Sequence, residues 1–360
     1  MKIIRTFSYW EKRSDYLFYS SIPILIAKNE NSRYHGLLTA VSAFVLLKNK
    51  KVYDIICNEN SKEAKGSDSM TFYVLGNGFD LHYGIPTKYC HFKTYLIENG
   101  YREIVDKVDD LFDRYGHCTS KEIKEWATFE DMLMVFNNLD PDELYDEAFD
   151  NAETDDDRAG YWDSPSWNVN YYNEYIKVLK DEFDNWIKKM NTEITPDRYF
   201  NPVMGDAVLT FNYTTTVEDN FDTRGIQITH IHGTKNQEIV LGHNDPPNPN
   251  LYNVIEDEDS DYRDTTTRNA INDVLTQASQ NYYKDSAQIL RGNHRIFSQI
   301  PRFDKVVIMG LSCGLQDKIY VEEIIKYASA IDFYYYGDDA KENFDNILGN
   351  SNMTVRYYKW

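Results

Sequence analysis

The chain has 360 residues, of which 42% are hydrophobic, so it can bury the core of one large domain or two ordinary ones. This composition excludes a chain that is disordered throughout. The net charge of −20 argues against direct binding of nucleic acid, which needs a basic surface, whereas backbone amides can still bind a small anion.

The first 69 residues differ from the rest of the chain. They are comparatively basic, contain two apolar patches and end in NENSKEAKGSDS, a polar stretch typical of a linker. We interpret residues 1–69 as an N-terminal appendage of uncertain structure, and Met70 as a candidate for the true start. The longest apolar run, 36–47, is shorter than the roughly 20 residues that a membrane span needs, and no signal-peptide pattern accompanies it. We therefore expect a cytoplasmic protein without membrane contact.

Strand and helix patterns alternate from Met70 onward, which predicts a mostly parallel, Rossmann-like α/β sheet covered on both faces. The predicted strands are 72–76, 207–213, 227–233, 238–244, 305–312, 331–337 and 353–359. The predicted helical segments are 88–137, 173–190, 250–300 and 317–329. The helical part at about 88–200 forms an inserted lobe within a domain of residues 70–360, and the acidic stretch 140–157 reads as a solvated surface.

Polar residues follow the predicted strands, where a parallel sheet binds its ligand. These residues are Asn77, Asp80, Asn212, His232, His243 and Ser312.

The stretch GNGFD (76–80) is an incomplete dinucleotide fingerprint. The third glycine of G-x-G-x-x-G is replaced by Leu81, and no acidic strand end follows at the usual distance. An ordinary NAD-dependent dehydrogenase is therefore disfavoured, and a tight turn alone would explain Gly76 and Gly78.

The stretch GLSCG (310–314) matches the nucleophile elbow of serine hydrolases. In that fold the catalytic histidine follows the serine, but the last histidine here is His294, upstream of Ser312. Ser312 is better explained as a helix cap or as a contact to a sugar or phosphate.

The two histidines of HIHG (230–233) alternate along a predicted strand and so point to opposite faces. His232, at the strand end, is the better candidate for the ligand cleft, and His230 for a packed or hydrogen-bonded position. Four scattered cysteines form no C-x-x-C pair and no third ligand has diagnostic spacing, so we predict no metal site.

Taken in order, these motifs resemble those of the bacteriophage abortive infection AbiH family. The resemblance covers about residues 70–330. It rests on LGNGFDLHYGIPTKYCHF (75–92), W-x-x-F-E-x-x-L (126–133), FNYTTTVE (211–218), HIHG (230–233), LGHND (241–245) and GLSCGLQD (310–317).

That family is in turn similar, at a distance, to sirtuin-like domains, which bind NAD. The similarity implies that Asn212 contacts the nicotinamide ribose and that His232 acts as the base. It also implies a nucleotide-binding set made of Gly76, Asn77, Gly78, Phe79, Asp80, Gly310 and Ser312. Asn77, Asp80 and Thr214 depart from the sirtuin pattern, which leaves the exact ligand open, and the missing C-x-x-C pairs disfavour protein deacylation.

The resemblance implies an anti-phage defence protein that cleaves the N-glycosidic bond of NAD to nicotinamide and ADP-ribose. Such a reaction has an oxocarbenium-like transition state, for which Asn212 would orient the ribose and His232 would accept a proton. NAD is then substrate or ligand, no metal is predicted, a phage-derived trigger is expected, and assembly into a homo-oligomer is compatible with this interpretation.

Other classes of function remain open. A nucleotide sensor without catalysis would use the same cleft, and an interaction module would use the acidic loop and the helical lobe instead. A nuclease is disfavoured by the net charge and by the lack of a paired-carboxylate metal motif.

Overall fold

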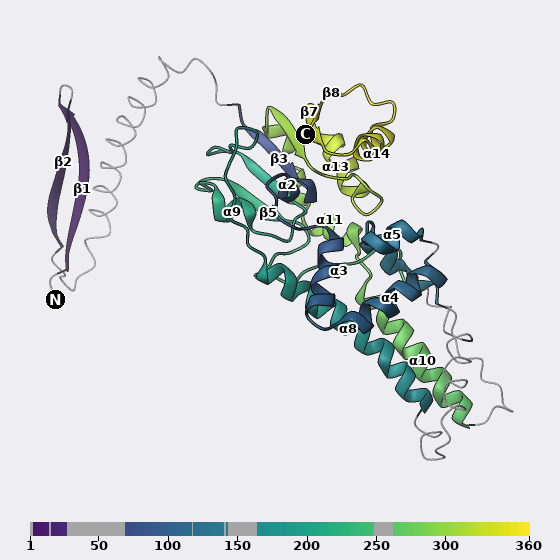
Figure 1. Ribbon diagram of the computed structural model, residues 1–360. Helices are drawn as coiled ribbons and strands as arrows, with labels where there is room; N and C mark the ends of the chain where they lie inside the picture. The colour runs from purple at the N-terminus through teal and green to yellow at the C-terminus, as the bar shows by residue number, and fades with distance from the viewer. Residues whose placement is uncertain are drawn as a thin grey trace. The chain divides into compact units, whose positions relative to one another are not determined.

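The structure is a computed structural model that describes residues 3–13, 16–26, 69–116, 118–139, 142, 164–247 and 262–360. The chain divides into two compact units, Met1–Asp68 and Ser69–Trp360. Figure 1 shows both units, with labels on many of their helices and strands.

The first unit contains an antiparallel pair of strands, β1 (Ile3–Arg13) and β2 (Tyr16–Ile26). Their register pairs Ile3 with Ile26 and Arg13 with Tyr16. The apolar run 36–47 lies outside the described residues. No helix in the described part of the chain has both the length and the apolar character to cross a bilayer.

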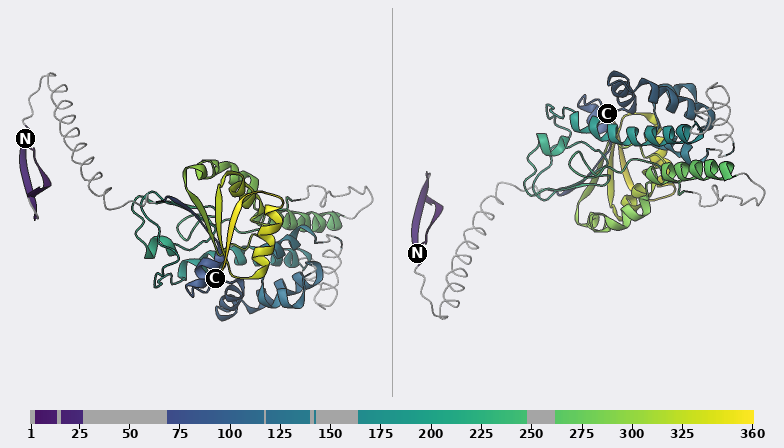
Figure 2. Two further views of the ribbon diagram at one scale, coloured as in Figure 1. Left: turned by 90° about the horizontal axis from the view of Figure 1, so that it is seen from above. Right: turned by 90° about the horizontal axis from the view of Figure 1, so that it is seen from below.

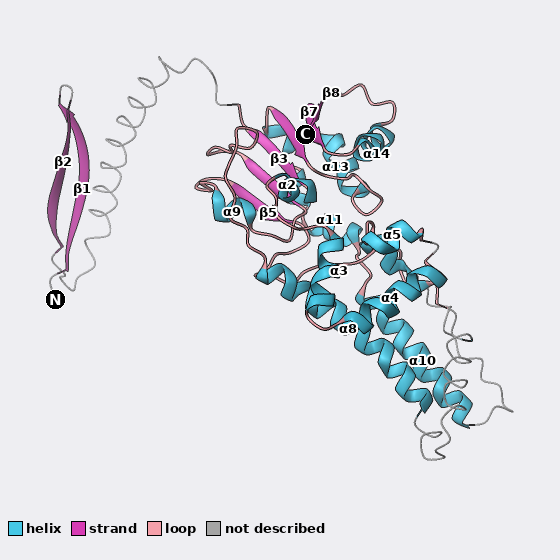
Figure 3. Ribbon diagram, viewed as in Figure 1, coloured by secondary structure: helices cyan, strands magenta, loops and turns pink. Residues whose placement is uncertain are grey.

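The second unit is built on a sheet of six parallel strands in the order β5-β4-β3-β6-β7-β8 (Figure 3). The strands are β3 (Thr71–Leu75), β4 (Ala207–Thr210), β5 (Gln227–His230), β6 (Lys305–Met309), β7 (Ala330–Tyr335) and β8 (Thr354–Lys359). Counted from β3, this is the 3-2-1-4-5-6 order of a Rossmann sheet, and the strand order reverses between β3 and β6. The predicted Rossmann-like α/β fold is confirmed.

Alternate residues of the central strands enter separate cores on the two faces of the sheet. Phe72 and Val74 belong to the core that also contains Tyr320, whereas Tyr73 and Leu75 belong to the other. Helices cover both faces (Figure 2). The helices of this part are α2 (Asn77–His82), α9 (Thr216–Asn220), α11 (Ser286–Gly292), α12 (His294–Phe297), η3 (Ile300–Arg302), α13 (Lys318–Tyr327) and α14 (Asp338–Leu348).

A helical lobe with its own core lies beside the sheet. Its elements are α3 (Tyr89–Glu98), α4 (Arg102–Tyr115), α5 (Ser120–Glu125), α6 (Phe129–Met132), η1 (Leu133–Asn137), α8 (Ser164–Lys189) and α10 (Tyr262–Asn281). Phe92, Trp126 and Phe183 are buried in this core together with residues of α10. Because α10 comes from between β5 and β6 and lies along α8 (Figure 1), the lobe is made from two insertions.

The prediction of a strand at 238–244 is wrong. These residues form a loop whose one ladder contact, in the described chain, is the bridge between His243 and Tyr283. The alternating pattern that suggested a strand arises because Ile239 and Leu241 insert into the core of the lobe. The strands β4 and β5 are also shorter than expected, so Asn212 and His232 lie in the loops that follow them.

The turns after β3 and β6 pack backbone against backbone at the point where the strand order reverses. The Gly78 amide donates to the Gly310 carbonyl at 2.8 Å. A Cβ at Gly76 would lie 2.5 Å from the Leu311 Cα, and one at Gly310 would lie 2.3 Å from the Phe79 nitrogen. Gly310 also has a φ of +67°, which side chains disfavour. The close contact between the two turns therefore explains these glycines without a bound ligand.

Replacing Gly310 by alanine is expected to lower the free energy of unfolding by more than about 2 kcal/mol, because left-handed strain and overpacking add. Urea denaturation of the full chain measures this. Gly292→Ala in α11 is the control, since no heavy atom lies within 4 Å of its added Cβ. Equal stability of the two variants would show that the turns do not depend on this contact.

Candidate functional site

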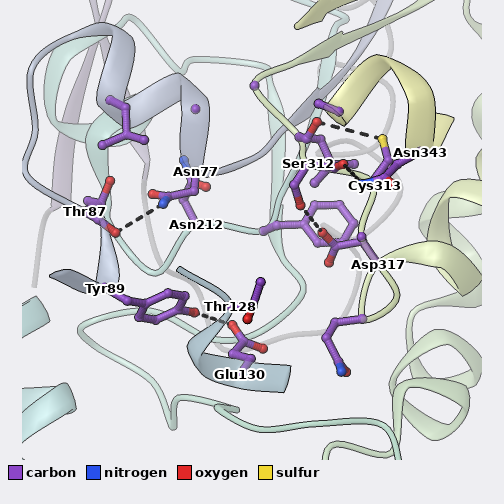
Figure 4. Close-up of a pocket in the computed structure, with 18 of the residues that line it drawn as sticks. Asn77, Thr87, Tyr89, Thr128, Glu130, Asn212, Ser312, Cys313, Asp317 and Asn343 are labelled. Carbon is purple, nitrogen blue, oxygen red and sulfur yellow. Dashed lines mark hydrogen bonds between the residues drawn. The ribbon is translucent and has the colours of Figure 1, made fainter. Parts of the chain in front are cut away.

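A cavity of about 770 Å³ lies at the carboxyl ends of β3, β4 and β6 (Figure 4). Its sheet side is formed by the loops that follow these strands, including Asn77, Asn212 and Ser312. Its other side comes from the lobe, through Tyr89 and Glu130. The cavity is therefore at the topological switch point, where open α/β sheets bind their ligands.

Most of the residues predicted for the site line this cavity. They are Asn77, Gly78, Asp80, Asn212, His232, Gly310 and Ser312. Gly76 and Phe79 are not among the lining residues. The Gly76 amide donates to the Met309 carbonyl, and the Phe79 ring packs edge-on against Phe200 in the core.

Asn212 and His232 each bring a buried polar atom without a partner to the cavity. Asn212 Oδ1 and His232 Nε2 have no hydrogen-bond partner in the described part of the chain. His230 holds the backbone of this segment, since its Nδ1 lies 3.0 Å from the Asn212 carbonyl and its Nε2 lies 2.7 Å from Glu218. A buried polar atom that is left unpaired costs free energy, so both atoms are candidates for ligand contact.

The His232 ring is enclosed by aromatic rings. Phe211 and Tyr320 lie edge-on to it, with centroids 5.5 and 5.6 Å away. Burial lowers the pKa of His232 well below its usual value, and the charge of Lys284 lowers it further. The imidazole is therefore neutral at pH 7 and can accept a hydrogen bond from a ligand hydroxyl.

Asp80 is a buried residue of the cavity lining, and two threonines donate hydrogen bonds to it. Its Oδ2 accepts from Thr214 at 2.6 Å, and its Oδ1 accepts from Thr216 at 2.8 Å. Burial raises the pKa of Asp80 to about 6, which these hydrogen bonds offset in part. Asp80 thus fixes the loop after Asn212, and Thr214 in that loop serves as one of its donors.

Glu130 joins the lobe to the sheet. Its Oε2 lies 2.6 Å from Lys284 Nζ, and its Oε1 accepts from the hydroxyls of Tyr89 and Tyr213. The Lys284 side chain is 1% exposed and that of Glu130 is 17% exposed. Burial and the Glu130 charge raise the pKa of both tyrosines, which therefore remain protonated donors.

Two further carboxylates, Asp131 and Asp317, line the cavity. Asp131 Oδ1 accepts from Gln316 at 2.6 Å, whereas Asp317 Oδ2 accepts a longer bond from Ser312 Oγ at 3.4 Å. Burial raises the pKa of both, and that of Asp317 reaches about 6. The cavity therefore contains an acidic half.

Sequence reasoning missed this acidic half. Glu130 stands inside the W-x-x-F-E-x-x-L motif and Asp317 ends GLSCGLQD, so both were visible as charged residues within apolar motifs. Lys284 carried no such signal. In the described chain, no group of three or more histidine, cysteine or acidic side chains is arranged to hold a metal ion.

The arrangement constrains where a phosphate could bind. The Gly78 and Phe79 amides already donate to the carbonyls of Gly310 and Gly76, so they are not free for a phosphate. Lys318 is the one cationic side chain among the described residues that line the cavity. An acidic wall favours instead a cationic ring or hydroxyl groups.

The fold and cavity define an α/β protein with a Rossmann-type sheet and a cavity at its switch point. The chain belongs to the bacteriophage abortive infection AbiH family, whose family model matches residues 72–336. Membership implies a role in abortive infection. The comparison with curated proteins and that with solved structures found no match. The distant relation to sirtuin-like domains stays a prediction.

The ion pair between Lys284 and Glu130 gives a stability prediction. Lys284→Met leaves the Glu130 charge without its partner and is expected to cost about 3–5 kcal/mol of unfolding free energy. The double variant Lys284→Met/Glu130→Gln is expected to recover part of this loss, because no unpaired charge remains. Urea denaturation measures both, and a double variant no more stable than Lys284→Met would contradict the account.

Asp80 gives a pH prediction. Its pKa is about 6 in the folded chain and has an ordinary value of 3.8, so the folded state binds more protons between these values. Asp80 therefore lowers stability as the pH rises through this window. Relative to Asp80→Asn, the natural chain is expected to lose about 1–3 kcal/mol between about pH 4 and 6.5. A difference between the two chains that stays constant with pH would contradict this.

Proposed function

We propose that this chain is a phage-defence enzyme that binds NAD, or a related nucleotide, and cleaves its N-glycosidic bond to release nicotinamide and ADP-ribose. The observation that carries the proposal is the pair of buried, unpartnered atoms, Asn212 Oδ1 and His232 Nε2, beside one cavity at the switch point of a Rossmann-type sheet. That crevice is the place where such sheets bind nucleotides.

For this reaction the chain has to orient the ribose and stabilise the positive charge of the transition state. The leaving group departs from a positively charged ring as a neutral molecule, so no acid has to protonate it. Asn212 would hold the ribose by a hydrogen bond to a hydroxyl, and neutral His232 would accept a second one. Both atoms would gain a hydrogen-bond partner when the ribose binds, and this gain favours binding of a group with several hydroxyls.

The acidic half of the cavity suits the reacting end of this substrate. Glu130, Asp131 and Asp317 line it, and carboxylates there favour both a cationic nicotinamide ring and an oxocarbenium-like transition state. The phosphate end would lie near Lys318 and the Ser312 loop, since the amides of the glycine turn are engaged with protein carbonyls.

Release of nicotinamide from NAD by the purified full-length chain tests the proposal, with and without extract of phage-infected cells. Asn212→Ala and His232→Ala are each expected to lower the rate by about 10²-fold or more. The matched controls are Asn350→Ala and His294→Ala, at exposed positions outside the cavity, which are expected to keep the natural rate.

Activity that survives both cavity substitutions would overturn the proposed site. If NAD or ADP-ribose raises the melting temperature while NAD stays intact under every condition, the proposed enzymatic activity is wrong and the chain is a nucleotide sensor. Absence of both binding and cleavage would overturn the proposal that the cavity binds a nucleotide.

A further inference from the structure

The carboxylates around the cavity differ in how fully the protein satisfies them. Asp80 accepts from two threonines, Glu130 from two tyrosines and a lysine, and Asp131 from a glutamine. Asp317 is the exception among these buried or half-buried groups. In the described chain its one side-chain hydrogen bond is the 3.4 Å contact from Ser312 Oγ.

Asp317 also lacks the hydrogen bonds that its position on α13 would normally give it. Asp317 is the N-cap residue of α13, where aspartate usually accepts from the backbone of the first turn. Here the side chain makes no capping hydrogen bond. Its carboxylate instead lines the cavity, on the wall that faces Asn212 in Figure 4.

We propose that Asp317 is the catalytic carboxylate that accepts one proton of the attacking water, with the hydroxyl oxygen of Ser312 beside it as the acceptor of the other proton, which orients this water. This assignment rests on the proposed function and adds to it the group that performs the proton transfer. Asn212 and the neutral His232 then hold the ribose on the facing side.

The step balances as a hydrolysis. The bond between the ribose C1′ and the nicotinamide nitrogen breaks, and its electron pair neutralises the ring. The water oxygen forms the new bond to C1′, and the water proton passes to the Asp317 carboxylate, from which it leaves to solvent. The products are nicotinamide, ADP-ribose and one proton, and no further reactant is needed.

His232 is less suited to take this proton. Its ring is enclosed by Phe211 and Tyr320, and the nearby charge of Lys284 opposes a second positive charge on the imidazole. A histidine in that setting accepts a hydrogen bond but holds a proton poorly.

The groups that face Asp317 set its proton affinity. Burial raises its pKa to about 6, Glu130 and Asp131 on α6 raise it, and Lys284 and the Ser312 hydroxyl lower it. A base with a pKa near the working pH combines availability with proton affinity. The rate is therefore expected to fall as the pH drops through about 6, where the carboxylate becomes protonated.

Steady-state release of nicotinamide by the full chain, between about pH 5 and 8, tests this assignment. Asp317→Asn, which keeps a good N-cap residue, is expected to lower kcat by about 10²–10⁴-fold, change KM little and remove the acidic limb of the pH profile. Asp317→Glu is expected to restore part of kcat together with that limb. Calorimetry with ADP-ribose checks that both variants still bind.

Asp304→Asn is the matched control, because Asp304 is exposed and precedes β6 at the opposite end of the strand from the cavity. It is expected to keep the natural kcat and pH profile. A natural chain that is active and an Asp317→Asn variant equal to it would overturn the role of Asp317 alone. A natural chain that releases no nicotinamide under any condition would overturn the proposed function and this step with it.

Discussion

The buried ion pair between Lys284 and Glu130 is the constraint on which the site depends. It joins Glu130 on α6 of the lobe to Lys284, in the segment that follows α10. Glu130 also accepts a hydrogen bond from Tyr213, which is the neighbour of Asn212 in the sequence. A charge pair this deeply buried is stable only when its remaining lone pairs are also satisfied, which the hydroxyls of Tyr89 and Tyr213 achieve. The lobe therefore forms a fixed wall of the cavity, held by the same polar cluster that makes it acidic.

The sheet side of the cavity is fixed by different means. Two glycine turns lock the ends of β3 and β6 together, and Asp80 ties the helix after β3 to the threonines after β4. These contacts fix the segments that carry Asn212 and His232, whereas Asn212 Oδ1 and His232 Nε2 have no hydrogen-bond partner in the described part of the chain.

The sequence predicted the part of this arrangement that follows from periodicity and strand order. The Rossmann-like sheet and the gathering of Asn77, Asn212 and Ser312 at one edge followed from strands that alternate with helices. It did not predict the wall contributed by the lobe, because the contact of Lys284 with Glu130 spans 154 positions and has no local pattern. The wrong prediction of a strand at 238–244 also arises from tertiary contacts. A loop that inserts Ile239 and Leu241 into a core has the same alternating pattern as a strand.

The division of the lobe between two insertions has a consequence for the chain as it is synthesised. Domains fold progressively from the N-terminus during translation, and contacts distant in sequence form late. The cavity needs α6, the loop after β4, Lys284 and the loop after β6, so a ribosome-bound chain that ends before β6 has half a sheet and no enclosed site. For a protein whose family acts by abortive infection, the cavity is thus assembled only after the loop that follows β6 has been synthesised, and products that end before this loop lack it.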